Sequence, residues 1–199
     1  MSTSSLPPVT PALMPTYARQ PVAFVRGEGV WLWDTDGKRY LDTTAGIAVC
    51  GLGHANPVVA AAIADQAATL VHTSNLYRVP LQEELADLLC QVSGMTHAFF
   101  GNSGAEANEA AIKLARLHGH KKGIAVPTVI VMENSFHGRT MATLTATGNA
   151  KIQEGFGPLV QGFVRVPFDD LEAIRKVAAE NPNIVAILVE PIQGESGVR

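Results

Sequence analysis

The stretch AFFGNSGAEAN, residues 98–108, joins a short apolar run to a glycine-flanked polar turn, and an alanine-rich segment follows it as far as Leu117. The apolar run is typical of a β-strand, and the alanine-rich segment is typical of an α-helix. A helix leaves its first backbone N–H groups without intrahelical partners and carries the positive end of its dipole there. The stretch therefore predicts a strand–turn–helix whose turn can bind a phosphate or a carboxylate.

A second interpretation of the same turn needs no ligand. Ser103 is a good N-cap residue, and Glu106, three residues later, would complete a capping box. The turn has neither the Gly-Lys-Ser/Thr end of a Walker loop nor the Gly-x-Gly-x-x-Gly pattern of a dinucleotide site. On these residues alone, an anion site and a structural cap both remain open.

Strand-type and helix-type segments alternate along the second half of the chain. Apolar and β-branched runs at residues 128–132, 163–166 and 184–189 predict strands, and residues 169–179 predict a helix. This alternation predicts an α/β domain with a mostly parallel sheet covered on both faces. Because ligands bind outside the carboxyl ends of such strands, we expect the polar loops at residues 101–108, 135–140 and 190–197 to converge.

The first part of the chain shows different signals. Residues 1–21 are rich in Ser, Thr and Pro and predict an extended arm. Asp36-Gly37 lies between short extended runs and predicts a β-hairpin, which a loop of small residues follows over residues 43–53. Asn56-Pro57 predicts the start of a helix that runs to about residue 68, and residues 80–90 predict a second, amphipathic helix.

Composition limits the classes of function. Of the 199 residues, 47% are hydrophobic and 17% are charged, which is typical of a globular protein with a buried core. The formal net charge of −3, with no basic stripe, argues against nucleic-acid binding. No apolar run is long enough to span a membrane, and no signal-peptide pattern is visible. Cys50 and Cys90 both lie in apolar surroundings and are typical of buried thiols rather than of a disulfide, so we expect a reducing, cytoplasmic compartment. The histidines and cysteines show no convincing metal-ligand spacing, and we expect no metal site.

Three motifs together resemble those of the class III pyridoxal-phosphate-dependent aminotransferases: NSGAEAN at residues 102–108, FHGRT at 136–140 and EPIQGE at 190–195. Weaker matches continue upstream to about residue 15. The resemblance implies an α/β three-layer sandwich with a mostly parallel sheet, the fold type I of pyridoxal-phosphate enzymes, with an N-terminal arm and hairpin. It also implies that residues 1–60 are an arm and hairpin segment of the small domain, and that residues 61–199 are the first part of an incomplete large domain.

The resemblance also implies roles for individual residues. Each side chain has a plain structural alternative: a surface salt bridge for an arginine, a core contact for an aromatic ring, a solvated loop charge for a glutamate. Ser103, Gly104 and Ala105 would hold the cofactor phosphate, Phe136 would stack on the cofactor ring, and Glu190 would lie close to its ring oxygen. Arg139 would bind the substrate α-carboxylate, and Glu195 would lie near the substrate side chain or pair with an arginine elsewhere. Tyr17 and Asn75 would belong to the substrate pocket or to the subunit interface.

The reaction implied by the resemblance is transamination of N2-acetylornithine or ornithine with 2-oxoglutarate, in arginine biosynthesis, by a homodimer. The alternatives are another class III donor, such as 4-aminobutyrate or succinylornithine, and a non-catalytic module of a split assembly. No lysine of this chain matches the family's Schiff-base lysine, so no catalytic residue is assigned. We expect the chain to be the N-terminal half of a longer enzyme and to be inactive by itself.

Overall fold

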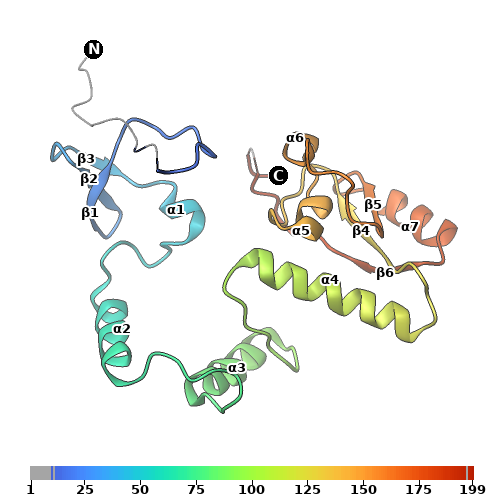
Figure 1. Ribbon diagram of the computed structural model, residues 1–199, viewed down its shortest axis with the longest axis horizontal. Helices are drawn as coiled ribbons and strands as arrows, with labels where there is room; N and C mark the ends of the chain where they lie inside the picture. The colour runs from blue at the N-terminus through green and yellow to red at the C-terminus, as the bar shows by residue number, and fades with distance from the viewer. Residues whose placement is uncertain (1–9, 11, 196) are drawn as a thin grey trace. The chain divides into compact units, whose positions relative to one another are not determined.

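The computed structural model describes residue 10, residues 12–195 and residues 197–199 (Figure 1). By their contacts the residues divide into two compact units, Met1–Pro80 and Leu81–Arg199. The predicted arm lies partly outside the described residues, and its described part, residues 12–21, contains no helix or strand. The predicted boundary after residue 60 lies inside a helix, and the assignment of the units to a small and a large domain stays a prediction.

In the first unit, three strands form an antiparallel sheet in the order β1 (Phe24–Glu28), β2 (Trp31–Asp34) and β3 (Arg39–Leu41). The predicted Asp36-Gly37 turn joins β2 to β3. Asp34 explains why the turn forms: its carboxylate accepts the backbone N–H groups of Asp36 and Lys38 at 3.0 and 2.8 Å. The Tyr40 hydroxyl donates to the other carboxylate oxygen at 2.8 Å. The predicted hairpin is therefore confirmed.

The two helices predicted next along the chain are present as α2 (Pro57–Thr69), in the first unit, and α3 (Pro80–Ser93), which lies in the second unit except for Pro80. Asn56 caps α2 by accepting the N–H groups of Val58 and Val59. The loop predicted over residues 43–53 contains a short turn, α1 (Ala45–Ala48), whose residues have positive φ angles between 48° and 64°. Neither α2 nor α3 contains a buried residue, so the described residues leave the apolar face predicted for the second helix uncovered.

The second unit contains the predicted parallel sheet. Its strands are β4 (Thr128–Met132), β5 (Phe163–Val166) and β6 (Ile184–Ile187), in the order β5-β4-β6. Both neighbours run parallel to β4, and all five residues of β4 are buried. A central strand that is buried at every position, with four apolar residues after Thr128, needs cover on both faces.

Helices supply that cover, as Figure 1 shows for α4 (Gly104–Lys121) and α7 (Leu171–Glu180). Val129 and Val131 pack on one face with Ala115 of α4 and with Ala146, the last residue of α5 (Met141–Ala146). Ile130 and Met132 pack on the other face against α7. The short helix α6 (Ala150–Gln153) follows α5. The three-layer α/β sandwich predicted from the sequence is confirmed.

Gly119 determines how closely α4 can approach the sheet. It is buried, and a Cβ atom placed on it would lie 2.6 Å from Pro127 Cβ and 2.9 Å from Val185 Cγ1. Only a glycine fits at this contact. One detail differs from the prediction: residues 98–100, expected to be a strand, have no strand beside them in the described chain and so form no ladder.

Candidate functional site

The N-terminus of α4 lies directly after the Gly101–Asn102 turn. Ser103 is the N-cap residue, and its hydroxyl accepts the Glu106 N–H at 3.2 Å. The expected capping box is only half present, because the Glu106 carboxylate accepts the N–H of Asn102 rather than that of Ser103. By helix geometry the N–H groups of Gly104 and Ala105 have no intrahelical acceptor. The turn therefore combines a helix cap with donors that can face an anion.

The second loop, residues 133–140, follows the buried end of β4. The Ser135 hydroxyl donates to the Met132 carbonyl at 2.8 Å, and the His137 N–H donates to Thr147 Oγ1 at 2.9 Å. These bonds leave Phe136 with 38% of its surface exposed, whereas His137 is buried. Arg139 is exposed at the end of the loop. The loop thus presents one aromatic ring and one guanidinium on a rigid support.

Three contacts join this loop to the start of α4. Gly138 has φ 129°, and a Cβ placed on it would lie 2.9 Å from Ala105 Cβ. The Asn108 side-chain amide donates to the His137 carbonyl at 2.8 Å. The Glu109 carboxylate accepts the Thr140 hydroxyl. The loop that carries Phe136 and Arg139 is therefore fixed to the helix that carries the free N–H groups.

The third loop follows β6. Glu190 Oε2 accepts the Phe136 N–H at 2.9 Å, and the Gln193 side chain donates to the Glu133 carbonyl at 2.8 Å. The loops after residue 100, after β4 and after β6 are thus joined by hydrogen bonds, which confirms the expected convergence. The functional roles assigned to their residues remain predictions.

The remaining predicted residues lie apart from this network or in the other unit. Glu195 lines a polar pocket together with Asn134, Lys151 and Arg199. Tyr17 and Asn75 belong to the first unit, where both are exposed. Their roles in substrate binding also stay predictions.

Sequence reasoning missed Arg165, which binds the C-terminal end of α5, the helix that follows the second loop. The Arg165 guanidinium donates to the carbonyls of Thr145 and Thr147, both at 2.9 Å, at the C-terminal end of α5. Burial lowers the pKa of Arg165, and burial together with the Arg165 charge lowers the pKa of His137. His137 is therefore uncharged at neutral pH, and its Nε2 atom is buried without a hydrogen-bond partner among the described residues.

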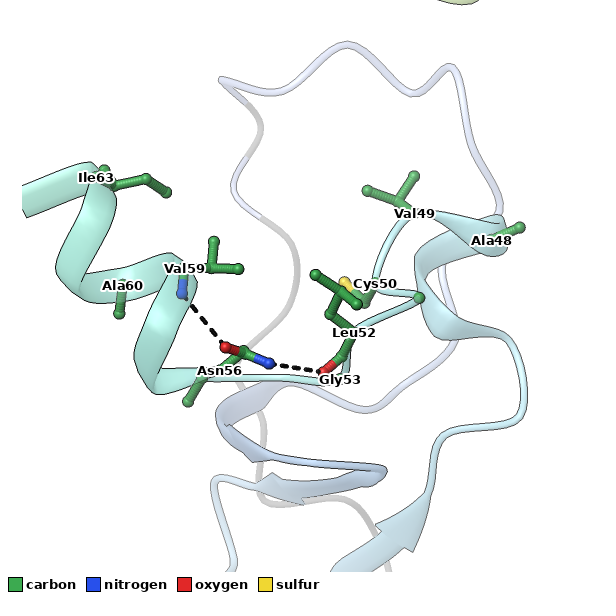
Figure 2. A pocket seen from close by; sticks show the side chains of 11 residues that line it. Ala48, Val49, Cys50, Leu52, Gly53, Asn56, Val59, Ala60 and Ile63 are labelled. Carbon is green, nitrogen blue, oxygen red and sulfur yellow. Dashed lines mark hydrogen bonds between the residues drawn. The ribbon is translucent and has the colours of Figure 1, made fainter. Parts of the chain in front are cut away.

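A pocket in the first unit, lined by residues from the end of α1 to α2, is of another kind. Figure 2 shows small and apolar side chains around it, including Val49, Leu52, Val59 and Ile63. The Asn56 side chain lies in its lining, where it accepts the Val59 N–H and donates to the Leu52 carbonyl. Apart from Cys50 it offers no ionisable side chain. Its lining indicates a packing surface rather than a polar ligand site.

Two classes of site are not found in the described part of the chain. No group of three or more His, Cys, Asp or Glu residues among the described residues is arranged to hold a metal ion. No helix in the described segments is long and apolar enough to cross a bilayer. The converging loops are thus the principal candidate site.

Comparison with known proteins bears directly on that site. A family model described as aminotransferase class-III matches residues 13–199. The acetylornithine aminotransferase of Nitrosomonas europaea is 68% identical over 186 residues, which cover 94% of this chain and 47% of that protein.

Solved structures give the same result. The acetylornithine aminotransferase of Elizabethkingia anophelis matches with a TM-score of 0.78 at 39% identity, over 93% of this chain and 45% of its own. The ornithine aminotransferase of Toxoplasma gondii matches with a TM-score of 0.88 at 32% identity, over 92% of this chain and 44% of its own. That structure reveals partial occupancy of PLP at the protein's active site.

This chain therefore spans about half the length of the curated relatives that it matches. The family-model match includes every motif described above, from the hairpin to the loop after β6. Within that match, hydrogen bonds join Asn108 to the loop after β4 and join that loop to Glu190 after β6. The chain belongs to the class III aminotransferase family.

Proposed function

We propose that the complete polypeptide is a pyridoxal-phosphate-dependent aminotransferase that uses N2-acetylornithine or ornithine as amino donor and 2-oxoglutarate as acceptor, in arginine biosynthesis. The observation that carries the proposal is the network that joins the α4 N-terminus, the Phe136–Thr140 loop and Glu190. The similarity to acetylornithine aminotransferases supports the choice of donor.

The residues present fit a pyridoxal phosphate. In this proposal the N–H groups of Gly104 and Ala105 and the Ser103 hydroxyl bind its phosphate, because a helix N-terminus favours an anion. The partly exposed Phe136 ring stacks on the cofactor ring, and Glu190, which already fixes the Phe136 backbone, lies near the ring oxygen. When bound, the cofactor supplies the electron sink that transamination requires.

Arg139 binds the α-carboxylate shared by both substrates, since its planar guanidinium can donate two parallel hydrogen bonds. Glu195, Tyr17 and Asn75 contact the remainder of the substrate. No residue of this chain is assigned as the Schiff-base lysine, and we propose that the complete polypeptide supplies it. Residues 1–199 alone are then expected to be inactive.

We further propose that the enzyme is a homodimer in the cytoplasm. The homodimer is supported by the amount of apolar surface left exposed on α2, where Val58 is 76% and Ile63 is 64% exposed. Exposed apolar surface of this kind marks contacts with other chain segments or other subunits. The assignment of residues 1–60 to the small domain and 61–199 to the large domain belongs to the same proposal.

The test is a donor panel with the purified complete polypeptide. We expect visible absorbance from bound cofactor, and turnover with 2-oxoglutarate that is fastest with N2-acetylornithine or ornithine. A preference for 4-aminobutyrate or succinylornithine would overturn the proposed donor but retain the reaction. A folded protein that binds no pyridoxal phosphate would overturn the enzyme proposal and favour a non-catalytic module.

A further inference from the structure

We propose that Asn108 and Glu109 are positioning residues that fix the Arg139 loop to the phosphate-binding end of α4, and so set where the substrate carboxylate lies relative to the cofactor. The inference rests on the proposed function and deepens it. Neither side chain belongs to the residues proposed to touch cofactor or substrate.

The two side chains hold the loop on both sides of Arg139. Asn108 donates to the His137 carbonyl at 2.8 Å, two residues before Arg139. Glu109 accepts the Thr140 hydroxyl, one residue after it, and the Thr143 N–H at 3.4 Å. The loop therefore has a fixed point before and after the guanidinium-bearing residue.

The partner side of this clamp is rigid. α4 is 18 residues long, and its far end packs against Pro127 and Val185 at the Gly119 contact. Near its start, Ala105 lies against Gly138. When the clamp is removed, the short loop is the part that moves, because the helix keeps its own hydrogen bonds and its contact with the sheet. The expected defect is a misplaced Arg139 with an intact phosphate site.

The chain offers well-matched variants for a test in the complete polypeptide. Asn108→Asp keeps the size of the side chain but removes the donor to His137. Glu109→Ala removes the acceptor, whereas Glu109→Gln retains an acceptor oxygen. Glu172→Ala is the control, because it removes the same charge from an exposed position on α7.

Two measurements separate positioning from general destabilisation. We expect Asn108→Asp and Glu109→Ala to raise KM for the amino donor and for 2-oxoglutarate together by about 10- to 100-fold, as a misplacement of about 1 Å can. The dissociation constant for pyridoxal phosphate should stay close to the wild-type value in the same variants, because the N-terminus of α4 keeps its position. In the cofactor-free protein, hydrogen exchange in residues 137–143 should accelerate in both variants but not in the Glu172→Ala control.

Glu109→Gln should restore most of the wild-type KM. Folded variants with wild-type KM values and wild-type exchange in residues 137–143 would overturn the inference. An equal loss of cofactor affinity would also overturn it, because the phosphate site would then have moved with the loop. A wild-type protein that neither binds pyridoxal phosphate nor transaminates is a different result: it overturns the proposed function itself.

Discussion

Replacing Gly138 with alanine tests whether the loop and α4 are in close contact at the site. The new Cβ atom would lie 2.6 Å from Thr143 Oγ1 and 2.9 Å from Ala105 Cβ, and the residue would keep a φ angle of 129°. Two costs therefore add. A side chain with positive φ costs about 1–2 kcal/mol, and crowding in a packed contact costs about 1–3 kcal/mol.

Gly155 provides the matched control, because it also has a positive φ angle, 83°, but a Cβ there would meet nothing within 4 Å. Gly155→Ala should therefore cost only the backbone strain, about 1–2 kcal/mol. Gly138→Ala should cost about 2–5 kcal/mol in all, so the difference between the variants isolates the crowding, about 1–3 kcal/mol.

The assay is urea-induced unfolding of the purified protein, followed by circular dichroism, with the free energy of unfolding compared between the two alanine variants and the wild type. Similar losses of stability in both variants would refute the close contact between Gly138, Thr143 and Ala105. A stabilising effect of Gly138→Ala would also refute the strained backbone.

Three further predictions concern packing, pH and substrate binding. Gly119→Ala should destabilise the fold by up to about 2 kcal/mol in urea titrations, because crowding against Pro127 and Val185, about 1–3 kcal/mol, opposes a gain of about 1 kcal/mol in helix propensity. A higher stability would contradict the packing of α4. Burial alone would raise the pKa of Asp34, but the hydrogen bonds from Tyr40 and from the backbone of the turn outweigh it and lower the pKa. Asp34 therefore stabilises the hairpin at pH values above its unfolded pKa, about 3.9, and this stabilisation is lost as the pH falls through the lower folded pKa. The difference in Tm between the wild type and Asp34→Asn should be constant above about pH 5 and shrink below about pH 4. A Tm difference that stays constant down to about pH 2 would contradict this prediction. Arg139→Lys should raise KM for both substrates by about 10- to 100-fold in steady-state kinetics, because the variant loses a hydrogen bond to a charged group. A change in KM for only one substrate would argue against a shared carboxylate site.

Local sequence signals predicted the elements whose causes lie within a few residues. Asn56-Pro57 and Asp36-Gly37 fixed a helix start and a turn through bonds between near neighbours. The parallel sheet followed from the spacing of apolar runs. The left-handed turn at Ala45–Ala48 had no such signal, because alanine and isoleucine rarely adopt positive φ.

The candidate site was predictable as a set of loops but not as a bonded network. The polar residues after each strand indicated convergence, since parallel strands end at one edge. The pairings themselves join residues far apart in the chain: Asn108 bonds to His137, and Phe136 bonds to Glu190. Glu106 shows the same limit. A capping box would pair its carboxylate with the Ser103 N–H, whereas the structure pairs it with the N–H of the preceding residue, Asn102. No local rule specifies such partners.

The strand order β5-β4-β6 has a consequence for synthesis of the chain on the ribosome. The central strand, β4, emerges first, and both strands that flank it are translated later. Until Ile187 has left the exit tunnel, a segment of five apolar or β-branched residues has at least one unpaired edge. Such edges pair readily with other chains. A nascent chain stalled between β4 and β6 is therefore expected to need a chaperone.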